Sequence, residues 1–579
     1  MDGHPYVIDD YFGQKGILSI LTILIIHDYM NKEAIFHKMD KEYAYALSEN
    51  KFLIKIRTKK DDISEVKLFY CDKYLRKYKR KEGRLFHKKM QKVFTDAYYN
   101  YFEVEIEIDV ICLRYFFKFV SNDEISYYGN YRFYNRKITT IDEMFDLSQQ
   151  VRVEEIFDIP SWAEGSIVYQ IFPDRFSRTN YDTSGIWYDP PKKFSRTLYG
   201  GTLKGITQHL DYLDDLGIQV IYLTPIFKSS SDHKYNTDDY LKIDEDFGSE
   251  IDFKELVDEC HKRNIKLILD GVFNHSGFMF EPFQDVIKNQ EKSKYKDWYY
   301  IKEFPVEISF SRDKVYKKPT WLTFGYAGMK PKLNTSNSEV REYIFKVARK
   351  YLELGIDGWR LDVADEISHD FWKEFRKVVK SINKDALIIG EVWYESTPWL
   401  LGDEYDTVMN YEFSRDIGLL TNDKNYKCSD FVNDYSFLLG RVHKRVRNYL
   451  WNLIDSHDTP RFLTSSKSKK KLKFALALQM VLPGMPMIYY GDEVGMEGKQ
   501  DPDCRRGMIW DEEKQDKELL TYYKKWINVR KNSKALQKGA TKFINVNDET
   551  KTFEIIREYK KELVKVLVDL KKYEVKIID

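Results

Sequence analysis

Apolar runs and amphipathic segments alternate through most of the chain. From Trp162 onward, short runs rich in Val, Ile and Leu are separated by stretches whose apolar residues recur at helical spacing. Eight such runs occur, at residues 167–176, 218–227, 265–273, 356–364, 386–393, 405–413, 451–458 and 485–493. Eight strands that alternate with helices predict an α/β fold, a (β/α)8 TIM barrel.

The predicted helices have one apolar face each. The first carries Ile206, Leu210, Leu213 and Leu216 and ends at Gly217, a residue favoured just beyond a helix. The next carries Phe253, Leu256, Val257 and Cys260, and a third runs from Val340 to Leu354 and ends at Gly355. These faces fit helices that cover a barrel.

The front and the end of the chain follow another pattern. Runs such as KFLIKIRTKK and YFEVEIEI are β-branched and aromatic, and charged turns separate them, which predicts an N-terminal β-sandwich. After the last barrel helix, TFEIIREY and ELVKVLVDL predict a small C-terminal β-domain. The domains expected are an N-terminal extension at 1–26, the sandwich at 27–134, a linker at 135–161, the barrel at 162–530 and the C-terminal domain at 531–579.

The connection after the third barrel strand is unusually long. Residues 276–334 carry aromatic and charged residues without a clear alternation of helix and strand. Loops of this length in a compact domain usually have a function. We therefore expect an excursion domain, 276–334, over the mouth of the barrel.

Composition excludes some classes of function. The net charge of +1 comes from 93 basic and 92 acidic residues, and no long basic patch points to nucleic acid. Aromatic residues make up 16% of the chain, an excess that fits a carbohydrate ligand as well as core packing. The five cysteines are widely spaced and form no zinc or disulfide pattern, which indicates reduced thiols in a cytoplasmic protein.

One apolar segment lies near the N-terminus, GILSILTILII at residues 16–26. It has roughly half of the 20 or so apolar residues that a membrane-spanning helix needs. Asp9 and Asp10 precede it, where a signal peptide has basic residues. We expect a packing segment and no membrane association.

Four of the eight runs deliver an acidic side chain at or just after the end of a strand: Asp270, Asp362, Glu391 and Asp458. A parallel barrel collects these ends on one face, so the four carboxyl groups are expected to share one cleft. Retaining glycoside hydrolysis uses two such groups, a nucleophile and an acid/base.

The neighbours of these acids suggest their roles. Arg360 lies two residues before Asp362, so both point to the same face, and its guanidinium would keep a nucleophile ionised. Glu391 follows an apolar run and precedes Val392 and Trp393, an apolar wall that suits a proton donor. Asp458 is left to bind hydroxyl groups more strongly in the transition state.

Two further polar residues lie at the same strand ends, and the role of Asp270 is still open. His275 and His457 are expected as neutral hydrogen-bond donors to sugar hydroxyls, although a structural role is equally compatible with their positions. Asp270 either binds substrate or anchors Arg360 as an ion pair, and the pairing is the preferred interpretation.

The motifs resemble a known family. DGVFNH, GWRLDVADE, GEVW and LIDSHD look like the four short signature regions of the α-amylase family, glycoside hydrolase family 13. IYLTPIF, HKYNTDDY, GMPMIYYGDEVGM and DPDCRRGMIW agree, so that the resemblance covers about residues 162–510. With PKLN, VADE and the front sandwich, the chain is similar to the neopullulanase, cyclomaltodextrinase and maltogenic amylase subgroup.

The resemblance implies roles for individual residues. Asp362 is the implied nucleophile, Glu391 the acid/base and Asp458 the transition-state stabiliser. The subsite of the attacked sugar is lined by His233, Tyr235, His275, Arg360 and His457, with Tyr235 stacked on the ring. Glu366 and Trp393, which belong to the VADE and GEVW motifs, complete the expected substrate-binding residues.

The resemblance also implies a substrate class and an assembly. Expected substrates are cyclodextrins, maltooligosaccharides and pullulan, cleaved at α-1,4 links with some α-1,6 cleavage, in a cytoplasmic homodimer. No cofactor is required. The segment after Asp174-Arg175-Phe176 has few of the six or more oxygen ligands that calcium takes, and Thr202 and Asp365 depart from the residues usual in the family and the subgroup.

Three alternatives remain at this point. Asp270, Asp362 and Glu391 could serve as metal ligands, although Arg360 on the same face would repel a divalent ion. The barrel could be a non-catalytic carbohydrate-binding or partner protein, although all three catalytic carboxylates are present. Finally, a sugar hydroxyl instead of water could attack the same covalent intermediate, so that the enzyme transfers the glycosyl group instead of hydrolysing the bond.

Overall fold

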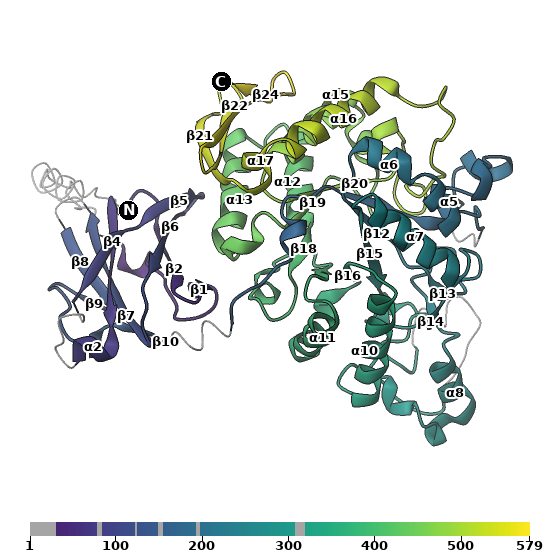
Figure 1. Cartoon of the computed structure of the whole chain (residues 1–579), viewed down its shortest axis with the longest axis horizontal. Helices are drawn as coiled ribbons and strands as arrows, with labels where there is room; N and C mark the ends of the chain where they lie inside the picture. Colours follow the sequence, from purple (N-terminus) through teal and green to yellow (C-terminus); the bar gives the residue numbers. More distant parts are fainter. Residues whose placement is uncertain are drawn as a thin grey trace, which may run out of the picture. The chain divides into compact units, whose positions relative to one another are not determined.

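The computed structural model describes residues 30–77, 84–121, 124–148, 155–192, 197–306 and 319–578. The chain divides into two compact units, Met1–Ile156 and Phe157–Asp579, referred to below as unit 1 and unit 2 (Figure 1). The apolar segment 16–26 lies outside the described residues. The boundaries expected for the linker and the C-terminal domain stay predictions.

Unit 1 is a β-sandwich, as the strand pattern predicted. One sheet has the order β1 (Ala44–Ser48), β2 (Lys51–Lys59), β6 (Tyr99–Glu107), β5 (Gln91–Thr95). The other has the order β4 (Phe86–Lys89), β3 (Glu65–Asp72), β7 (Cys112–Ser121), β8 (Glu124–Gly129), β9 (Arg132–Tyr134), with β10 (Phe145–Ser148) paired to β7. A short helix, α2 (Lys73–Lys77), follows β3.

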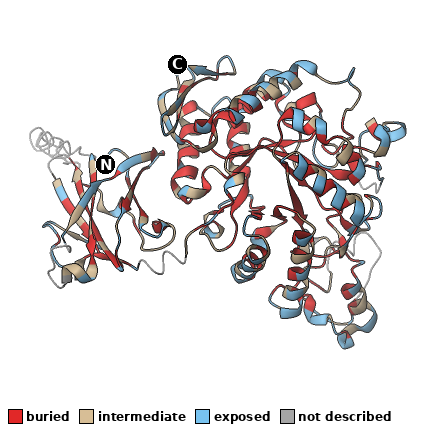
Figure 2. Cartoon of the chain, in the orientation of Figure 1, coloured by how far each residue is buried: buried red, intermediate tan, exposed pale blue. Residues whose placement is uncertain are grey.

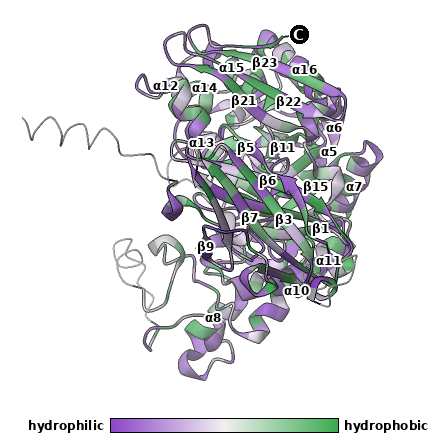
Figure 3. Cartoon of the chain, turned by 90° about the vertical axis from the view of Figure 1, so that its left-hand side faces the viewer, coloured by the Kyte–Doolittle hydropathy of each residue, from purple (hydrophilic) through white to green (hydrophobic). Residues whose placement is uncertain are grey.

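The two sheets of unit 1 enclose one apolar core. Ile54 and Ile56 of β2 are fully buried and lie opposite Val104 and Phe102 of β6 in the antiparallel register. Phe117 of β7 belongs to the same cluster, which joins both sheets. Hydrophobic and hydrophilic positions mix along these strands (Figure 3), as expected where one face of a sheet is buried and the other faces solvent.

Unit 2 contains the closed barrel that the eight apolar runs predicted. Its strands, all parallel, are β11 (Val168–Ile171), β12 (Val220–Leu223), β15 (Lys266–Gly271), β16 (Gly358–Leu361), β17 (Leu387–Gly390), β18 (Thr407–Asn410), β19 (Trp451–Leu453) and β20 (Met485–Tyr489). Nearly every strand residue is buried, which explains the continuous apolar runs (Figure 2).

Helices surround these strands. In chain order the longer ones are α5 (Leu203–Gln208), α6 (Leu210–Leu216), α7 (Glu250–Lys262), α10 (Ser338–Glu353), α11 (His369–Ile382), α12 (Tyr411–Asn422), α13 (Cys428–Arg441), α15 (Lys469–Val481) and α16 (Lys517–Lys531). Shorter helices are α4 (Pro173–Phe176), α14 (Phe462–Ser466) and α17 (Lys534–Lys538). Four apolar residues of α7 are fully buried, Phe253, Leu256, Val257 and Cys260, as their spacing predicted.

The first predicted helix differs from expectation. Its apolar face is buried, but the backbone leaves the helical region at His209 (φ −105°, ψ 11°), so α5 and α6 are separate helices. Gly217 adopts φ +94° and its N–H bonds the carbonyl of Leu213, the left-handed cap that its position predicted. Apolar spacing alone does not reveal such a break.

The excursion leaves and rejoins the barrel at one place. It contains α8 (Glu281–Asn289) and several single turns, and an antiparallel bridge pairs His275 at its start with Lys332 near its end. A two-stranded sheet, β13 (Phe227–Ser229) and β14 (Thr237–Ile243), adds a second loop at the same end of the barrel. Both insertions thus follow carboxyl ends of barrel strands.

The chain ends in an antiparallel sheet of β21 (Ala540–Asn547), β22 (Thr552–Tyr559), β23 (Glu562–Asp569) and β24 (Glu574–Ile578). Phe553, Ile555 and Val566 form its buried face. Arg557, fully buried, donates hydrogen bonds to the carbonyls of Val481 and Gly539 at 2.7 and 3.0 Å. The bond to Val481 fixes the sheet to the end of α15, within unit 2.

The structure also bears on the state of the cysteines and on membrane-spanning helices. All five cysteines are buried and unpaired, in agreement with the prediction of reduced thiols. Across the described ranges, no helix has both the length and the apolar character that crossing a bilayer requires.

Candidate active site

The four predicted acids lie at the carboxyl ends of barrel strands. Asp270 belongs to the end of β15, and Asp362, Glu391 and Asp458 follow β16, β17 and β19. The backbone continues the barrel ladder past the strands, because Asp362 N–H bonds the Gly271 carbonyl at 3.1 Å and Glu391 N–H bonds the Leu361 carbonyl at 2.9 Å. Rigid barrel backbone therefore positions the acids.

Arg360 ties three of these carboxyl groups together. Its Nη1 donates to both oxygens of Asp270, at 2.9 and 3.0 Å, and to Oδ1 of Asp362 at 3.1 Å. Its Nη2 lies 2.8 Å from Oε2 of Glu391. Arg360 and Asp270 are buried beneath the site, whereas Asp362 and Glu391 are each 6% exposed. The ion pair between Arg360 and Asp270 is the structural role that we preferred for Asp270.

One guanidinium faces three carboxyl groups, so the cluster has an excess of acid. Burial is the largest influence and raises the pKa of Asp362 well above its ordinary value, the Glu391 charge adds to the rise, and Arg360 opposes it. Burial likewise raises the pKa of Asp270 to about 6, with Arg360 again opposing the rise. We expected the Arg360 guanidinium to hold Asp362 ionised; it does lower the pKa of Asp362, but burial has the larger and opposite effect.

This excess has a chemical consequence. Two neighbouring carboxyl groups in a dry site do not both ionise readily, so one of them keeps its proton to a higher pH than an isolated carboxyl group would. A retaining glycoside hydrolase requires one ionised and one protonated carboxyl group at the same time. The cluster can therefore supply both forms.

The surroundings of Glu391 differ from the apolar wall that the sequence indicated. The indole N–H of Trp393 donates to Oε1 at 2.9 Å, and the backbone N–H of Val363 donates to Oε2 at 3.0 Å. The ring of Trp393 stacks on Tyr411 with centroids 3.9 Å apart and is 40% exposed. Trp393 therefore orients the carboxyl group through a hydrogen bond, which residue type alone did not predict.

Asp362 and Glu391 open into a pocket of about 540 Å³. Residues that the sequence proposed and that line it are His233, Tyr235, Asp362, Glu366, Glu391, Trp393 and Asp458. Three other proposed residues, His275, Arg360 and His457, are fully buried behind the lining. The structure thus brings all ten together, seven at the surface of the pocket and three in its support.

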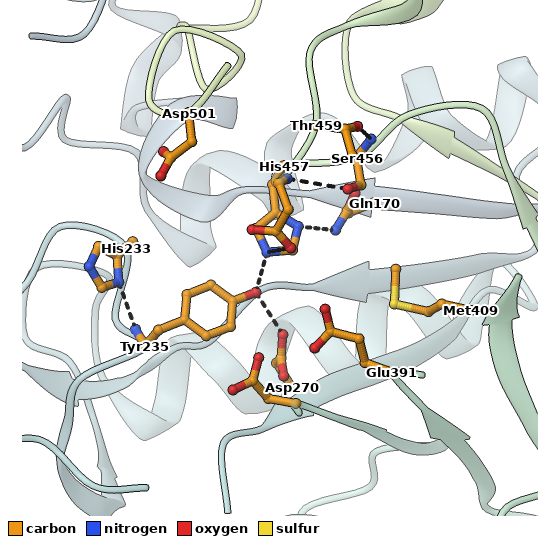
Figure 4. A network of polar contacts seen from close by, with 12 residues as sticks. Gln170, His233, Tyr235, Asp270, Glu391, Met409, Ser456, His457, Thr459 and Asp501 are labelled. Atoms are coloured by element: carbon orange, nitrogen blue, oxygen red, sulfur yellow. Dashed lines mark hydrogen bonds and ion pairs between the residues drawn. The ribbon is translucent and has the colours of Figure 1, made fainter. Parts of the chain in front are cut away.

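A chain of hydrogen bonds runs through the supporting layer (Figure 4). The amide Nε2 of Gln170 donates to Nδ1 of His457 at 2.8 Å, so Nε2 of His457 carries the proton and contacts the Tyr235 hydroxyl at 2.5 Å. The Tyr235 hydroxyl donates to Asp270 at 3.0 Å. Tyr235 is 7% exposed and stacks on His457, so its orientation is fixed before a ligand enters.

The histidines around the pocket are neutral. Burial lowers the pKa of His233, His275 and His457 well below the ordinary value. The charge of Lys330 lowers the pKa of His233 and His275 further, and that of Arg505 lowers the pKa of His233 and His457. A neutral imidazole can donate a hydrogen bond without adding positive charge. This state agrees with the expectation of neutral donors at these strand ends.

Asp458 is held from two sides. Nη2 of Arg505 lies 3.1 Å from its Oδ1, and Nε2 of His457 lies 3.2 Å from its Oδ2. Arg505 also pairs with Asp501 at 2.8 Å. The sequence motif DPDCRRGMIW was noted without assigning Asp501 or Arg505 to the site, although a charged motif in the loop after the last barrel strand was the available signal.

The remaining lining residues come from loops. Phe324 and Lys330 belong to the excursion, and Val363, Asp365 and Tyr394 follow β16 and β17. The ring of Phe324 stacks on His275 with centroids 4.9 Å apart. None of these positions had a spacing that predicted its place in the pocket.

In the described part of the chain, no group of three or more His, Cys, Asp or Glu side chains is arranged to hold a metal ion. Protein groups donate hydrogen bonds to Asp174, in the segment where the sequence made a calcium site doubtful. Its carboxylate accepts the backbone N–H groups of Tyr199 and Gly200 at 2.9 to 3.0 Å and lies 3.0 Å from Nε of Arg175. A guanidinium and two amides therefore occupy its oxygens.

Comparison with known proteins agrees with this geometry. Residues 170–561 match the alpha amylase catalytic domain and residues 30–149 the alpha amylase N-terminal Ig-like domain. A cyclomaltodextrinase from Bacillus sp. is 40% identical over 93% of this chain and 95% of its own length. Neopullulanase 2 from Thermoactinomyces vulgaris is 39% identical over 93% and 91%.

A solved cyclomaltodextrinase structure superposes with a TM-score of 0.87 at 39% identity, and covers 93% of this chain and 91% of that one. The family match spans more than half of the chain, and it includes the strands that carry the acid cluster. The chain therefore belongs to the α-amylase family, glycoside hydrolase family 13, and is a glycoside hydrolase.

Proposed function

We propose that this enzyme cleaves α-1,4 glucosidic bonds in cyclodextrins, maltooligosaccharides and pullulan, with some α-1,6 cleavage and with retention of configuration. One observation carries the proposal: Asp362 and Glu391 both face the pocket and contact the two terminal nitrogens of one guanidinium, Arg360. Carboxyl groups this close suit a double displacement, in which the two groups are about 5 to 5.5 Å apart.

In the first step Asp362 attacks the anomeric carbon while Glu391 gives its proton to the departing glycosidic oxygen. The positive charge that develops on the sugar favours the ionised form of Asp362, so the proton that the cluster retains resides on Glu391 as the reaction proceeds. In the second step Glu391 removes a proton from water, which attacks the same carbon and releases Asp362. Both steps use groups already in contact with Arg360.

Asp458 is proposed to bind hydroxyl groups of the attacked sugar, with His457 supporting it from behind the lining of the pocket. Asp458 is held by Arg505, and the proton on Nε2 of His457 is fixed by Gln170, so neither group must reorganise when the sugar ring flattens. His233 and Tyr235 are proposed to contact the same sugar from the opposite loop. Glu366 and Trp393 are proposed to bind the next sugar, past the cleaved bond.

Relatives support the substrate class. Proteins about 40% identical over most of the chain are named cyclomaltodextrinase and neopullulanase, and one from Bacillus acidopullulyticus is named maltogenic alpha-amylase. The test is product analysis on β-cyclodextrin, pullulan and soluble starch side by side. We expect β-cyclodextrin and pullulan to be cleaved faster than starch, with α-anomers formed first. Cleavage of starch alone, or β-anomers as first products, would contradict the proposal.

Glycosyl transfer is a second outcome of the same chemistry. Tyr394 is 79% exposed and Trp393 40% exposed, and both rings line the pocket. Exposed rings at a lip offer an acceptor sugar a surface to bind, so that its hydroxyl replaces water in the second step. Longer products than the substrate, formed at high maltotriose concentration and lost in Tyr394→Ala, are the expected sign.

We further propose a cytoplasmic homodimer. A relative from Bacillus subtilis, 36% identical over 88% of the chain, is named intracellular maltogenic amylase. In unit 1, Tyr98 and Ile111 are 74% and 73% exposed, apolar side chains that a subunit interface would cover. A monomeric mass in solution together with full activity on β-cyclodextrin would refute the dimer.

A further inference from the structure

One charged residue of the pocket has no role in the chemistry described so far. Lys330 lines the pocket, and its side chain is only partly exposed. The second cation of the lining, Arg505, is paired with Asp458 and Asp501. The ammonium of Lys330 forms no hydrogen bond and no ion pair with any other residue that the structure describes.

The backbone places this ammonium with precision. Lys330 N–H bonds the Ala327 carbonyl at 2.8 Å, and the Lys330 carbonyl accepts from Phe324 N–H at 3.0 Å. Pro331 follows, which restricts Lys330 to an extended conformation, and Pro331 itself forms a bridge with Thr323. The loop 323–331 is therefore closed at its base and presents Lys330 from a fixed position.

Contacts on the side chain also direct it toward the pocket. Its Nζ lies 5.2 Å from the centre of the Phe324 ring, a cation–π contact, and that ring stacks on His275. The loop thus forms a stack of an imidazole, a phenyl ring and an ammonium group. The Phe324 ring therefore contacts both the imidazole of His275 and the ammonium of Lys330.

The charges that face Lys330 come from every wall of the pocket. Asp362 follows β16, Asp458 follows β19, and Asp501 and Arg505 belong to the loop after β20; these are the groups that act on Lys330 most strongly. Burial lowers the pKa of Lys330, and the three carboxylates oppose that change. With Glu391, Glu366 and Asp365 also in the lining, acidic groups outnumber cations, so an empty pocket without Lys330 would favour positively charged ligands.

We propose that Lys330 is a substrate-contacting, specificity-determining residue: its ammonium donates hydrogen bonds to the hydroxyl oxygens of a neutral glucan and repels cationic sugars from an otherwise acidic pocket. The inference rests on the proposed function and deepens it, because it defines the ligand class of the same site. An ammonium has three donors and no acceptor, which suits hydroxyl oxygens that replace its water. No bond is made or broken by Lys330.

The two parts of the inference can be tested separately with three substitutions. Lys330→Met removes the charge and the donors, Lys330→Gln keeps a donor without charge, and Lys330→Arg keeps both. Binding is measured by calorimetry at pH 7 in a Glu391→Gln background, which prevents turnover. The ligands are maltotriose, which is neutral, and maltosyl-isofagomine, a trisaccharide analogue of the same length whose ring nitrogen is protonated.

Lys330→Met is expected to weaken maltotriose binding three- to tenfold, the value of one or two hydrogen bonds. The same substitution should strengthen maltosyl-isofagomine about tenfold relative to maltotriose, because a unit charge within the pocket is removed. Lys330→Gln should recover most of the maltotriose affinity and still favour the cation, and Lys330→Arg should match the parent. The preference for the cation should shrink in high salt.

Equal affinities in the parent and Lys330→Met, or an equal change for both ligands, would overturn the inference. If Lys330→Met does not fold, the ratio of the two affinities in Lys330→Gln and Lys330→Arg decides the same question. Hydrolysis of β-cyclodextrin by the unmodified enzyme is assayed independently. A parent that binds both ligands but cleaves no glucan refutes the proposed function alone, whereas a parent that binds neither ligand refutes both.

Discussion

The Nη2 atom of Arg360 lies 2.8 Å from Oε2 of Glu391, which links the ends of two neighbouring barrel strands by a buried ion pair. The same guanidinium holds Asp270 and Asp362. Three acids of the site are therefore organised around one cation, and the mechanism depends on that arrangement. The predictions below begin with this cluster.

Removal of Arg360 should destabilise unit 2. Arg360→Met leaves Asp270 buried without its partner, and loss of one partner of a buried pair costs about 3–5 kcal/mol. All 11 tryptophans of the chain lie at or after Trp162, so tryptophan fluorescence during urea unfolding reports on unit 2 alone. The double variant Arg360→Met, Asp270→Leu should regain part of the lost free energy of unfolding. If Arg360→Met is as stable as the parent, the ion pair makes no net contribution to stability.

Asp362→Asn and Glu391→Gln should each lower kcat on maltotriose by about three orders of magnitude or more with the fold unchanged. A substrate with a good leaving group separates the two roles. Glu391→Gln should cleave α-maltosyl fluoride at a substantial rate, because fluoride leaves without protonation, whereas Asp362→Asn should not. Similar behaviour of both variants on the fluoride would mean that the roles are assigned incorrectly.

A lower pH should reduce the stability of unit 1 because one buried histidine becomes protonated on unfolding. His37 is buried; its Nδ1 contacts the Lys55 carbonyl at 2.7 Å and its Nε2 the Tyr115 hydroxyl at 2.9 Å. Burial lowers the pKa of His37 to about 3, so between the ordinary value and 3 the unfolded chain binds a proton that the folded chain does not. Stability contributed by His37 is complete above about pH 6.5 and falls as the pH drops.

The expected loss is about 2 kcal/mol between pH 6.5 and pH 5. It can be measured by hydrogen exchange of peptides from unit 1 in the whole protein. The control His37→Asn should lower stability at pH 7 but flatten its dependence on pH. An unchanged slope in His37→Asn would assign the acid sensitivity to other groups.

Exhaustive chelation should leave turnover unchanged. The carboxylate of Asp174, at the segment where calcium was considered, already accepts two backbone N–H groups and faces Arg175. A divalent ion would have to displace these donors. Initial rates on β-cyclodextrin before and after dialysis against EDTA, with and without added calcium, measure this directly. A loss that calcium restores would show that a metal supports the fold or the site.

The barrel could be predicted because its strands are buried on both faces, which leaves apolar runs that end in Asp270, Asp362 and Glu391. The positions of these acids follow from where each run stops. By contrast, Phe324 and Lys330 arrive through a long excursion whose path no periodic pattern encodes. Phe324 reaches the site by stacking on His275, and Lys330 by its contact with Phe324, so the approach depends on packing that the strand pattern does not encode.

The protonation states of the acids could not be predicted from the sequence either. The position of Arg360 two residues before Asp362 predicted their contact, and the structure has it. The sequence did not reveal that the same guanidinium is shared with Asp270 and Glu391, or that burial outweighs it at Asp362. Nor did the residue type of Trp393 show that its N–H, rather than its ring, faces Glu391.

The most direct test of the account is to trap the covalent intermediate. The enzyme, or its Glu391→Gln variant, is mixed with 5-fluoro-α-maltosyl fluoride, digested and examined by mass spectrometry. The account predicts one added glycosyl group on the peptide that contains Asp362, and none in Asp362→Asn. A label on another residue, or steady turnover of the reagent with no labelled peptide at any time, would contradict it.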